Sequence, residues 1–359
     1  MVKLTLDEIA NLSGVSRSTV SRVINRRTNV RPETRDQVEK VIARTGYSPN
    51  PAARSLAGSR SSTLALVVPE TSEILFTDPY FSHLIQGVAD ACNQYDYTLS
   101  LILLPQADNR HRLPNRLLHA RLFDGVVVTA TYIDDLLVPY LLHNEIPFVS
   151  VGQCHDPRVS YVDADNQGGA YAAVSHLIKL GHTRVATITG PTNNLAALQR
   201  KQGYLNALWD HGLAVDESLI AAGNYTEESG CLAMERLLPF KPEAIFVASD
   251  TMALGALKTL RAAGVAVPRD MAMVGYDDLP PATSADPPLT TVRQPIRQTG
   301  RQAVETLLDI LEHGQAPPRH IIAPTQLIVR ASCGATTLNT IKIEGGKSTQ
   351  ITQPVLPNV

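Results

Sequence analysis

Polar side chains near the amino terminus have the types and spacing of a surface that reads DNA bases. In residues 17–25, a helical period places Val20, Val23 and Ile24 on one buried face. The opposite, exposed face then carries Arg17, Ser18, Ser21, Arg22 and Asn25. Arginine can donate two hydrogen bonds to guanine in the major groove, and serine suits phosphate oxygens. The pattern therefore predicts a recognition helix, and the ordinary alternative is a solvated basic helix.

The elements around this helix are those that a helix-turn-helix requires. A first amphipathic helix ends before Gly14, which allows a tight connector, and Ser16 is a good N-cap for the second helix. A third helix is expected to begin at Pro32 and to end at Gly46. Together these signals predict a small all-α head.

Charge is divided unevenly along the chain. Residues 1–60 contain 11 Lys and Arg but only 5 Asp and Glu, a net charge of +6. The other 299 residues have a net charge of −8. This asymmetry indicates a polyanionic partner for the first segment only.

Several classes of protein are excluded by the sequence. No apolar run approaches the ~18–20 residues that span a bilayer, and Asp7 and Glu8 interrupt any signal-peptide core. The four cysteines and ten histidines lack metal-ligand spacing, and GxSxG, HExxH and P-loop motifs are absent. We therefore expect a cytoplasmic protein that is not an enzyme and has no metal, cofactor or membrane partner.

From Thr63 onward, continuous apolar runs alternate with amphipathic stretches of helix length. Residues 64–68, 185–188, 244–248 and 271–274 are examples of such runs. This alternation is typical of parallel sheets covered by helices on both faces. Because about 270 residues are many for one α/β core, we expect two lobes.

Polar and aromatic residues follow several of these runs, where ligands of open α/β sheets bind. Asp277 and Arg200 can each bond two neighbouring hydroxyl groups, and Asp78 follows the first run in a long loop. The rings of Phe81 and Tyr225 can cover the apolar face of a sugar. Each residue alone also fits a helix cap, an ion pair or core packing, so both interpretations stay open at this point.

The sequence resembles the LacI/GalR family of bacterial repressors. The resemblance is carried by residues 4–10, 15–16 and 19–25, by several positions between 35 and 58, and by the body to about residue 332. It implies a helix-turn-helix head and a two-lobed, periplasmic-binding-protein-like α/β body with parallel sheets.

The resemblance also implies domain boundaries. We expect the DNA-binding domain at 1–48, a hinge helix and linker at 49–62, the effector-binding and dimerisation domain at 63–335, and a disordered tail at 336–359. Within the body, the amino-terminal lobe takes about 63–164 and 295–323, and the carboxy-terminal lobe about 165–294 and 324–332.

Roles in DNA binding follow from the same resemblance. Arg17 and Ser18 would select operator bases, and Leu56 would be an apolar wedge that a hinge helix inserts into the minor groove. A linker leucine that packs on the body is the alternative for Leu56. The complete set of implied DNA contacts is Thr5, Ser16, Arg17, Ser18, Thr19, Ser21, Arg22, Asn25, Asn29, Thr34, Asn50, Ala53 and Leu56.

For the effector, the resemblance adds Ser249 and Gln294 to the five residues named above. The implied contacts are Asp78, Phe81, Arg200, Tyr225, Ser249, Asp277 and Gln294. Ser249 stands where many sugar-binding members have Asn, and Gly152 where many have an acidic residue. The sequence therefore does not specify how the hydroxyl groups of the ligand are arranged. A carbohydrate is favoured as the ligand, and the alternative is a purine stacked on the rings of Tyr80, Phe81 and Tyr225.

We therefore predict a cytoplasmic, homodimeric repressor that binds a pseudo-palindromic, double-stranded operator and is released by a small carbohydrate. One alternative is a co-repressed regulator with a purine-like ligand. A solute-binding protein of a transporter is the other, which the added head and the lack of a signal peptide disfavour.

Overall fold

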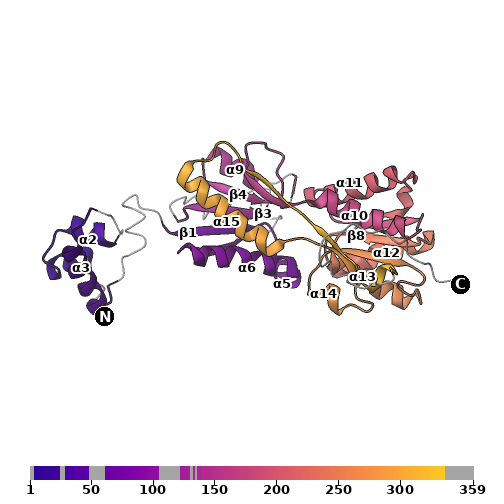
Figure 1. Ribbon diagram of the computed structural model, residues 1–359, viewed down its shortest axis with the longest axis horizontal. Coiled ribbons are helices and arrows are strands. Elements are labelled where there is room, and N and C mark those ends of the chain that lie inside the picture. Colours follow the sequence, from indigo (N-terminus) through magenta and orange to yellow (C-terminus); the bar gives the residue numbers. More distant parts are fainter. Residues whose placement is uncertain are drawn as a thin grey trace, which may run out of the picture. The chain divides into compact units, whose positions relative to one another are not determined.

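The computed structural model describes residues 4–24, 29–47, 61–104, 122–129, 132–133 and 136–335 (Figure 1). The expected hinge helix with Asn50, Ala53 and Leu56 lies outside these residues, as do Asn25 and the expected tail at 336–359. Contacts divide the chain into two compact units, a small one that includes the amino terminus to Thr63 and a large one that starts at Leu64. We call them the head and the body.

The described residues of the head form three helices, α1 (Leu6–Leu12), α2 (Arg17–Ile24) and α3 (Pro32–Thr45). A capping box starts α1, because Thr5 Oγ1 accepts the Glu8 N–H at 3.3 Å and the Glu8 carboxylate accepts the Thr5 N–H at 2.6 Å. These contacts satisfy backbone donors that the first turn of a helix leaves free.

Turns of the head agree with the sequence signals. Ser16 Oγ accepts the Thr19 N–H at 3.2 Å at the start of α2. Gly14 and Gly46 have φ values of +61° and +62°, the left-handed conformation that glycine adopts at little cost. The three helices bury one apolar cluster that is centred on Ile9, Ala10, Val20, Val23, Val38 and Val41. The predicted inward face of α2 is thus inside, which leaves its polar face toward solvent.

Two six-stranded sheets form the core of the body, one in each lobe. The amino-terminal lobe has the strand order β11-β5-β4-β3-β1-β2. Its strands are β1 (Thr63–Val68), β2 (Thr98–Leu103), β3 (Gly125–Thr129), β4 (Phe148–Val151), β5 (Tyr161–Ala164) and β11 (His320–Ala323). The neighbours β1–β3, β3–β4, β4–β5 and β5–β11 are all parallel.

The carboxy-terminal lobe has the order β12-β10-β9-β8-β6-β7. Its strands are β6 (Val185–Thr189), β7 (Ile220–Ala222), β8 (Ala244–Val247), β9 (Ala272–Asp277), β10 (Thr290–Arg293) and β12 (Gln326–Ile328). All pairs are parallel except β10–β12, in which the edge strand β12 runs antiparallel. The fully buried strands read as apolar runs because helices cover the sheets.

Helices pack on both sheets (Figure 1). The amino-terminal lobe has α5 (Ser72–Thr77), α6 (Pro79–Gln94), α9 (Leu137–His143) and α15 (Ile296–His313). The carboxy-terminal lobe has α10 (Asn166–Lys179), α11 (Leu195–Asp210), α12 (Glu227–Leu237), α13 (Asp250–Ala262) and α14 (Pro280–Ser284). Within the described ranges, three short 3-10 helices span Glu217–Leu219, Leu238–Phe240 and Ala331–Cys333. No helix in the described ranges is long and apolar enough to cross a membrane.

The chain passes between the lobes three times. It crosses from β5 to α10 at Asp165, from β10 to α15 at Gln294 and Pro295, and from β11 to β12 at Pro324 and Thr325. Loops that follow the strands of both sheets line the space between the lobes, as expected for ligand sites of α/β proteins.

Candidate functional site

A cavity of about 120 Å³ lies between the two lobes of the body. All seven residues expected at the effector site line it. Asp78 and Phe81 come from the amino-terminal lobe, and Gln294 comes from a crossing segment. The carboxy-terminal lobe supplies Arg200, Tyr225, Ser249 and Asp277. Residues from distant parts of the sequence thus meet in one place.

Arg200 is the central cation of this cavity, and its side chain is held on several sides. It is 6% exposed, and its guanidinium carbon lies 3.7 Å from the ring centroid of Tyr276. Nε donates to Asn166 Oδ1 at 2.9 Å, and Nη1 donates to the Ala248 carbonyl at 2.6 Å. Nη1 also lies 3.4 Å from Asp277 Oδ1. These hydrogen bonds to described residues use Nε and Nη1 of Arg200. The N–H groups of its Nη2 therefore remain as donors for a ligand.

Asp277 occupies a strained position at the end of β9. Its φ of +118° is rare for a residue with a side chain, and such strain costs about 1–3 kcal/mol and is common at ligand sites. Gln294 Nε2 donates to its Oδ1 at 2.6 Å. Burial raises the pKa of Asp277 to about 7, although Arg200 lowers it, and Asp78 raises it further. The carboxyl group is therefore a fixed hydrogen-bonding group that can exchange a proton near neutral pH.

Four other buried or half-buried carboxyl groups lie in the wall of this cavity or behind it. Burial raises the pKa of Glu70, Asp78, Asp163 and Asp250 above their ordinary values. Asp250 stands behind the site, where its Oδ1 accepts the Thr291 hydroxyl at 2.6 Å. The cavity thus offers many acceptors around one arginine, an arrangement that favours neutral ligands rich in O–H donors over anions.

Two of the expected contacts also cap helices. Ser249 Oγ accepts the Met252 N–H at 3.2 Å at the start of α13, and Asp78 Oδ1 accepts the Tyr80 N–H at 3.0 Å at the start of α6. The hydroxyl proton of Ser249 remains available to a ligand. Both side chains are therefore held in place before any ligand arrives.

Aromatic rings line the cavity from both lobes. Phe81 is 6% exposed and meets Tyr80 edge to face, with ring centroids 5.4 Å apart. Tyr225 has a φ of +69°, and its ring packs against Gly190, where a Cβ atom would lie 2.4 Å from Tyr225 Cζ. Gly190 therefore allows the Tyr225 ring to reach the cavity.

Sequence reasoning missed many of the residues that line this cavity. They are Glu70, Ile74, Tyr80, Tyr132, Val151, Gly152, Gln153, Asp163, Asn166, Asn194, Leu195, Ala196 and Asn224. Tyr80 and Gly152 were weighed in the sequence but not chosen as contacts. Gln153 follows β4 and Asn194 follows β6, so applying the strand-end rule to every strand would have found them. Asn166, the first residue of α10, was not expected at the site, and its Oδ1 accepts the Arg200 hydrogen bond.

Contacts across the cleft join the lobes directly. Gln199 Nε2 of α11 donates to Gln153 Oε1 at 2.6 Å, and the Ile133 N–H donates to the Asn193 carbonyl at 2.9 Å. Tyr132 donates its hydroxyl proton to Glu70 at 2.6 Å within the amino-terminal lobe. The described state is therefore one in which the lobes touch across the cavity.

The head presents most of the expected DNA contacts to solvent. Arg17, Ser18 and Arg22 are exposed on α2, as is Asn29 after it. Ser16 and Thr5 are exposed, and their side chains also cap the first turns of α2 and α1. Thr19, Ser21 and Thr34 are partly exposed. Arg17 Nη1 lies 3.6 Å from Asp7 Oδ2, with both side chains more than half exposed. Such an exposed ion pair contributes little to stability, so Arg17 can leave Asp7 and bind another partner at little cost.

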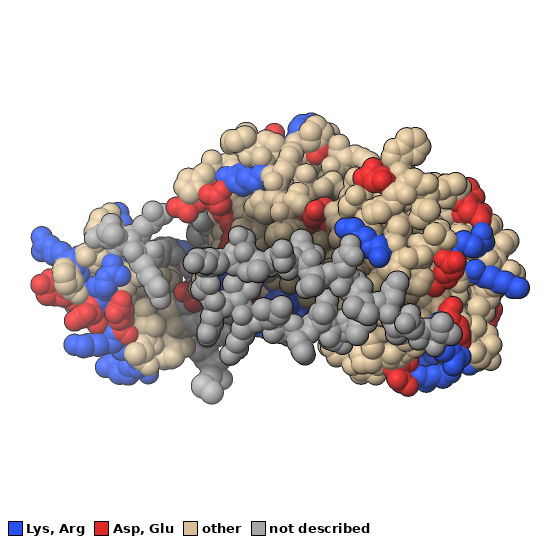
Figure 2. Space-filling model, turned by 45° about the vertical axis from the view of Figure 1, so that its right-hand side comes forward, with Lys and Arg blue, Asp and Glu red and all other residues tan. Residues whose placement is uncertain are grey.

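Charges on the visible face of the structure are mixed (Figure 2). Basic and acidic side chains both appear on the head and on the body. No group of histidine, cysteine, aspartate or glutamate in the described ranges is arranged to hold a metal ion. The four cysteines are free thiols.

Comparison with known proteins gives two domain matches. Residues 5–50 match the model of bacterial regulatory proteins of the lacI family, and residues 174–333 match the periplasmic binding protein-like domain. The HTH-type transcriptional regulator CelR of Thermobifida fusca is 40% identical over 91% of this chain and 98% of its own length. The chain belongs to the LacI family of bacterial regulatory proteins. It is a transcriptional regulator and not an enzyme.

Other LacI-family members are similar over most of their length. The HTH-type transcriptional repressor PurR of Vibrio atlanticus is 33% identical over 85% of this chain and 91% of its own length. A solved structure described as a CelR–cellobiose complex has a TM-score of 0.73 at 39% identity, and covers 92% of this chain and 99% of its own. The solved structure of the lac repressor dimer bound to operator and an anti-inducer has a TM-score of 0.80 at 27% identity. The match covers 93% of this chain and 100% of that chain. The predicted fold class and family are thus confirmed.

Proposed function

We propose that this LacI-family protein is a cytoplasmic, homodimeric repressor that a small carbohydrate releases from its operator. The observation that carries the proposal is the cavity between the lobes, in which all seven expected residues lie. A dimer supplies two heads, and two heads match a pseudo-palindromic, double-stranded site.

Three properties of the cavity support a carbohydrate. It has many carboxylate and amide acceptors for hydroxyl protons, one arginine for hydroxyl oxygens, and rings such as Phe81 and Tyr225 for the apolar face of a pyranose. CelR, whose complex with cellobiose is similar in fold and sequence, makes cellobiose the first candidate. The surplus of carboxyl groups argues against a phosphorylated sugar because like charges would be buried together.

On the DNA side, we propose that α2 enters the major groove. Arg17, Ser18 and Arg22 are exposed on this helix and have the chemistry to bond base edges and phosphates. Thr5, Ser16, Thr19, Ser21, Asn29 and Thr34 would hold the backbone. Asn25, Asn50, Ala53 and Leu56 keep the roles that the resemblance implies, with Leu56 as the wedge in the minor groove.

Effector and operator would be coupled through lobe closure. A ligand shifts the equilibrium between two closure states only by its difference in affinity for them. In one state the paired amino-terminal lobes would hold the hinges at the spacing that the operator needs, and the sugar would favour the other state. A coupling free energy of about 1–3 kcal/mol is ordinary for such a system.

The class of effector can be tested by thermal shift of the full-length protein. We expect cellobiose to raise the melting temperature, because a ligand that binds only the folded state stabilises it. Asp277→Asn should abolish this shift while the variant still melts cooperatively. A shift with a purine base but with no sugar would overturn the carbohydrate assignment and support a purine-like ligand, which Tyr80, Phe81 and Tyr225 would stack.

A further inference from the structure

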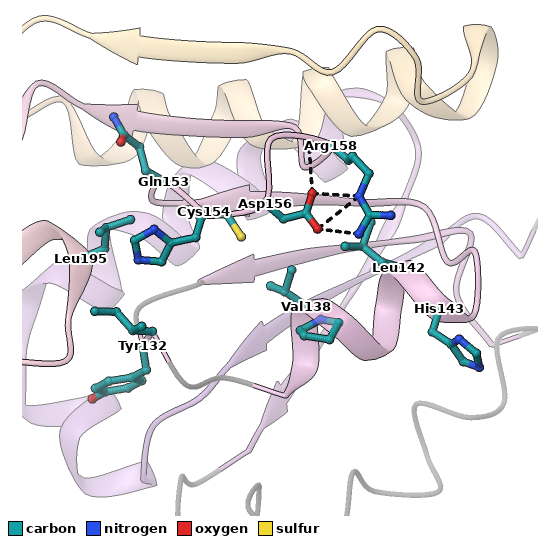
Figure 3. Close-up of a pocket in the computed structure, with 12 residues that line it drawn as sticks. Tyr132, Val138, Leu142, His143, Gln153, Cys154, Asp156, Arg158 and Leu195 are labelled. Atoms are coloured by element: carbon teal, nitrogen blue, oxygen red, sulfur yellow. Dashed lines mark hydrogen bonds and ion pairs between the residues drawn. The ribbon is translucent and has the colours of Figure 1, made fainter.

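A second cavity, of about 400 Å³, lies beside the first (Figure 3). We propose that the two cavities form one extended ligand site, in which the second accommodates a further sugar ring of an oligosaccharide. This inference rests on the proposed carbohydrate function and deepens it. None of the residues expected at the effector site lines the second cavity.

The two cavities share part of their wall. Tyr132, Gln153 and Leu195 line both of them. Gln153 follows β4 in the amino-terminal lobe, and Leu195 is the first residue of α11 in the carboxy-terminal lobe. A ligand that occupied both cavities would therefore contact these side chains, which come from both lobes.

Size separates the roles of the two cavities. The first cavity, at about 120 Å³, is the smaller of the two in the described state. The second, at about 400 Å³, falls within the ~300–1,000 Å³ that is typical of small-molecule sites. The second cavity therefore offers space for a further ring of a disaccharide or longer sugar.

The lining of the second cavity has the two kinds of surface that a sugar ring needs. Leu142 and Leu195 supply apolar surface for the C–H face of a pyranose, and Tyr132 adds an aromatic ring. Arg158 and Asp156 supply polar groups for hydroxyls, and Figure 3 shows them on the side of the cavity away from Tyr132 and Leu195.

Electrostatics favour a neutral ligand in this cavity. Arg158 Nε lies 2.9 Å from Asp156 Oδ1, and Arg158 Nη2 lies 2.6 Å from Asp156 Oδ2. These bonds lower the pKa of Asp156 to about 2, so the pair stays ionised and internally compensated at neutral pH. Since the arginine charge is already matched, an anion gains little, whereas hydroxyl groups can bond to the remaining donors and acceptors.

Isothermal titration of the full-length protein with glucose, cellobiose and cellotriose tests the proposal. We expect affinity to rise at least about tenfold from glucose to cellobiose, because the second ring makes new contacts. Arg158→Ala with His155→Ala removes exposed polar groups from the second cavity and should weaken cellobiose binding by about fivefold or more. Leu142→Trp, which fills the cavity, should weaken it further. Neither change should alter the binding of glucose.

A matched control is available elsewhere on the surface. Arg269 pairs with Asp270 through Nε at 3.0 Å and Nη2 at 2.9 Å, as Arg158 pairs with Asp156, but lines neither cavity. Arg269→Ala should bind each sugar as the wild-type protein does. Equal affinity for glucose and cellobiose, or unchanged cellobiose binding in both cavity variants, would overturn the extended site and leave the proposed function standing. Failure of all three sugars to bind would instead contradict the carbohydrate function itself.

Discussion

At the residue scale, the side chains of Arg200 and Asp277, two candidate ligand contacts, are fixed by their neighbours in the fold. Asn166, the Ala248 carbonyl and the Tyr276 ring fix the guanidinium, so little order is lost when a ligand binds. Their residue types made both candidates from the sequence, and the resemblance to the LacI/GalR family implied them as effector contacts. The support from Asn166 could not be predicted, because it depends on how α10 and α11 pack.

The raised pKa of Asp277 predicts a pH dependence of stability. Its ordinary value is 3.8 and its value in the fold is about 7, so between these limits the folded protein holds a proton that the unfolded chain has released. The free energy of unfolding of the ligand-free protein should therefore fall as the pH rises from about 4 to about 7. Urea titrations at several pH values measure this slope.

Asp277→Asn provides the comparison for that measurement. The variant cannot ionise at this position, so its stability should change less over the same pH range than that of the wild-type protein. Equal slopes for the two proteins would show that Asp277 keeps an ordinary pKa in the fold. The pKa values of Asp78, Asp163 and Asp250 are also raised. These residues should therefore cause part of the fall in stability with pH in both the wild-type protein and the variant.

A further prediction at the residue scale concerns the contact of Arg17 with operator bases. Arg17→Ala should weaken operator binding by ~1–3 kcal/mol and relax the preference at one base pair, because a bidentate contact to guanine would be lost. Binding to a panel of operators with single substitutions measures both effects. A uniform loss on every sequence would mean that Arg17 contacts only phosphate.

At the element scale, helix starts and strand ends position almost every candidate side chain. The helices of the head and the buried strands could be predicted because their apolar periods and their Pro, Gly and Ser signals are local. The strand order could not be, since the three crossings and the antiparallel β12 depend on long-range pairing. Tyr132 and Gln153 follow β3 and β4, and they were missed because the strand-end rule was not applied to these two strands.

Thr5 tests the importance of a helix start in the head. Thr5→Ala removes the capping box of α1 and should destabilise the head by about 0.5–2 kcal/mol, as measured by denaturant titration followed by circular dichroism. Thr5→Ser keeps the cap and should restore most of the stability. Wild-type stability with reduced operator affinity in Thr5→Ala would instead show that the hydroxyl acts only on DNA.

At the scale of the whole molecule, we propose that the cleft between the lobes couples ligand binding to DNA binding. The lobes touch through Gln199 and Gln153 in the described state, and the candidate ligand cavities lie where the lobes meet. A sugar that bridges the lobes changes the free energy of closure, and closure is what we propose the paired hinges respond to. Family and fold could be predicted from the sequence, whereas the second cavity could be seen only in the structure.

The most direct test of this account is operator binding measured by fluorescence anisotropy at fixed salt, with and without cellobiose. We predict that saturating cellobiose raises the operator Kd by about 5–150-fold, the range of ordinary allosteric coupling. Asp277→Asn should bind the operator as tightly as the wild-type protein and show no response to the sugar. If cellobiose binds to the protein and the operator Kd does not change or decreases, release by a carbohydrate is contradicted.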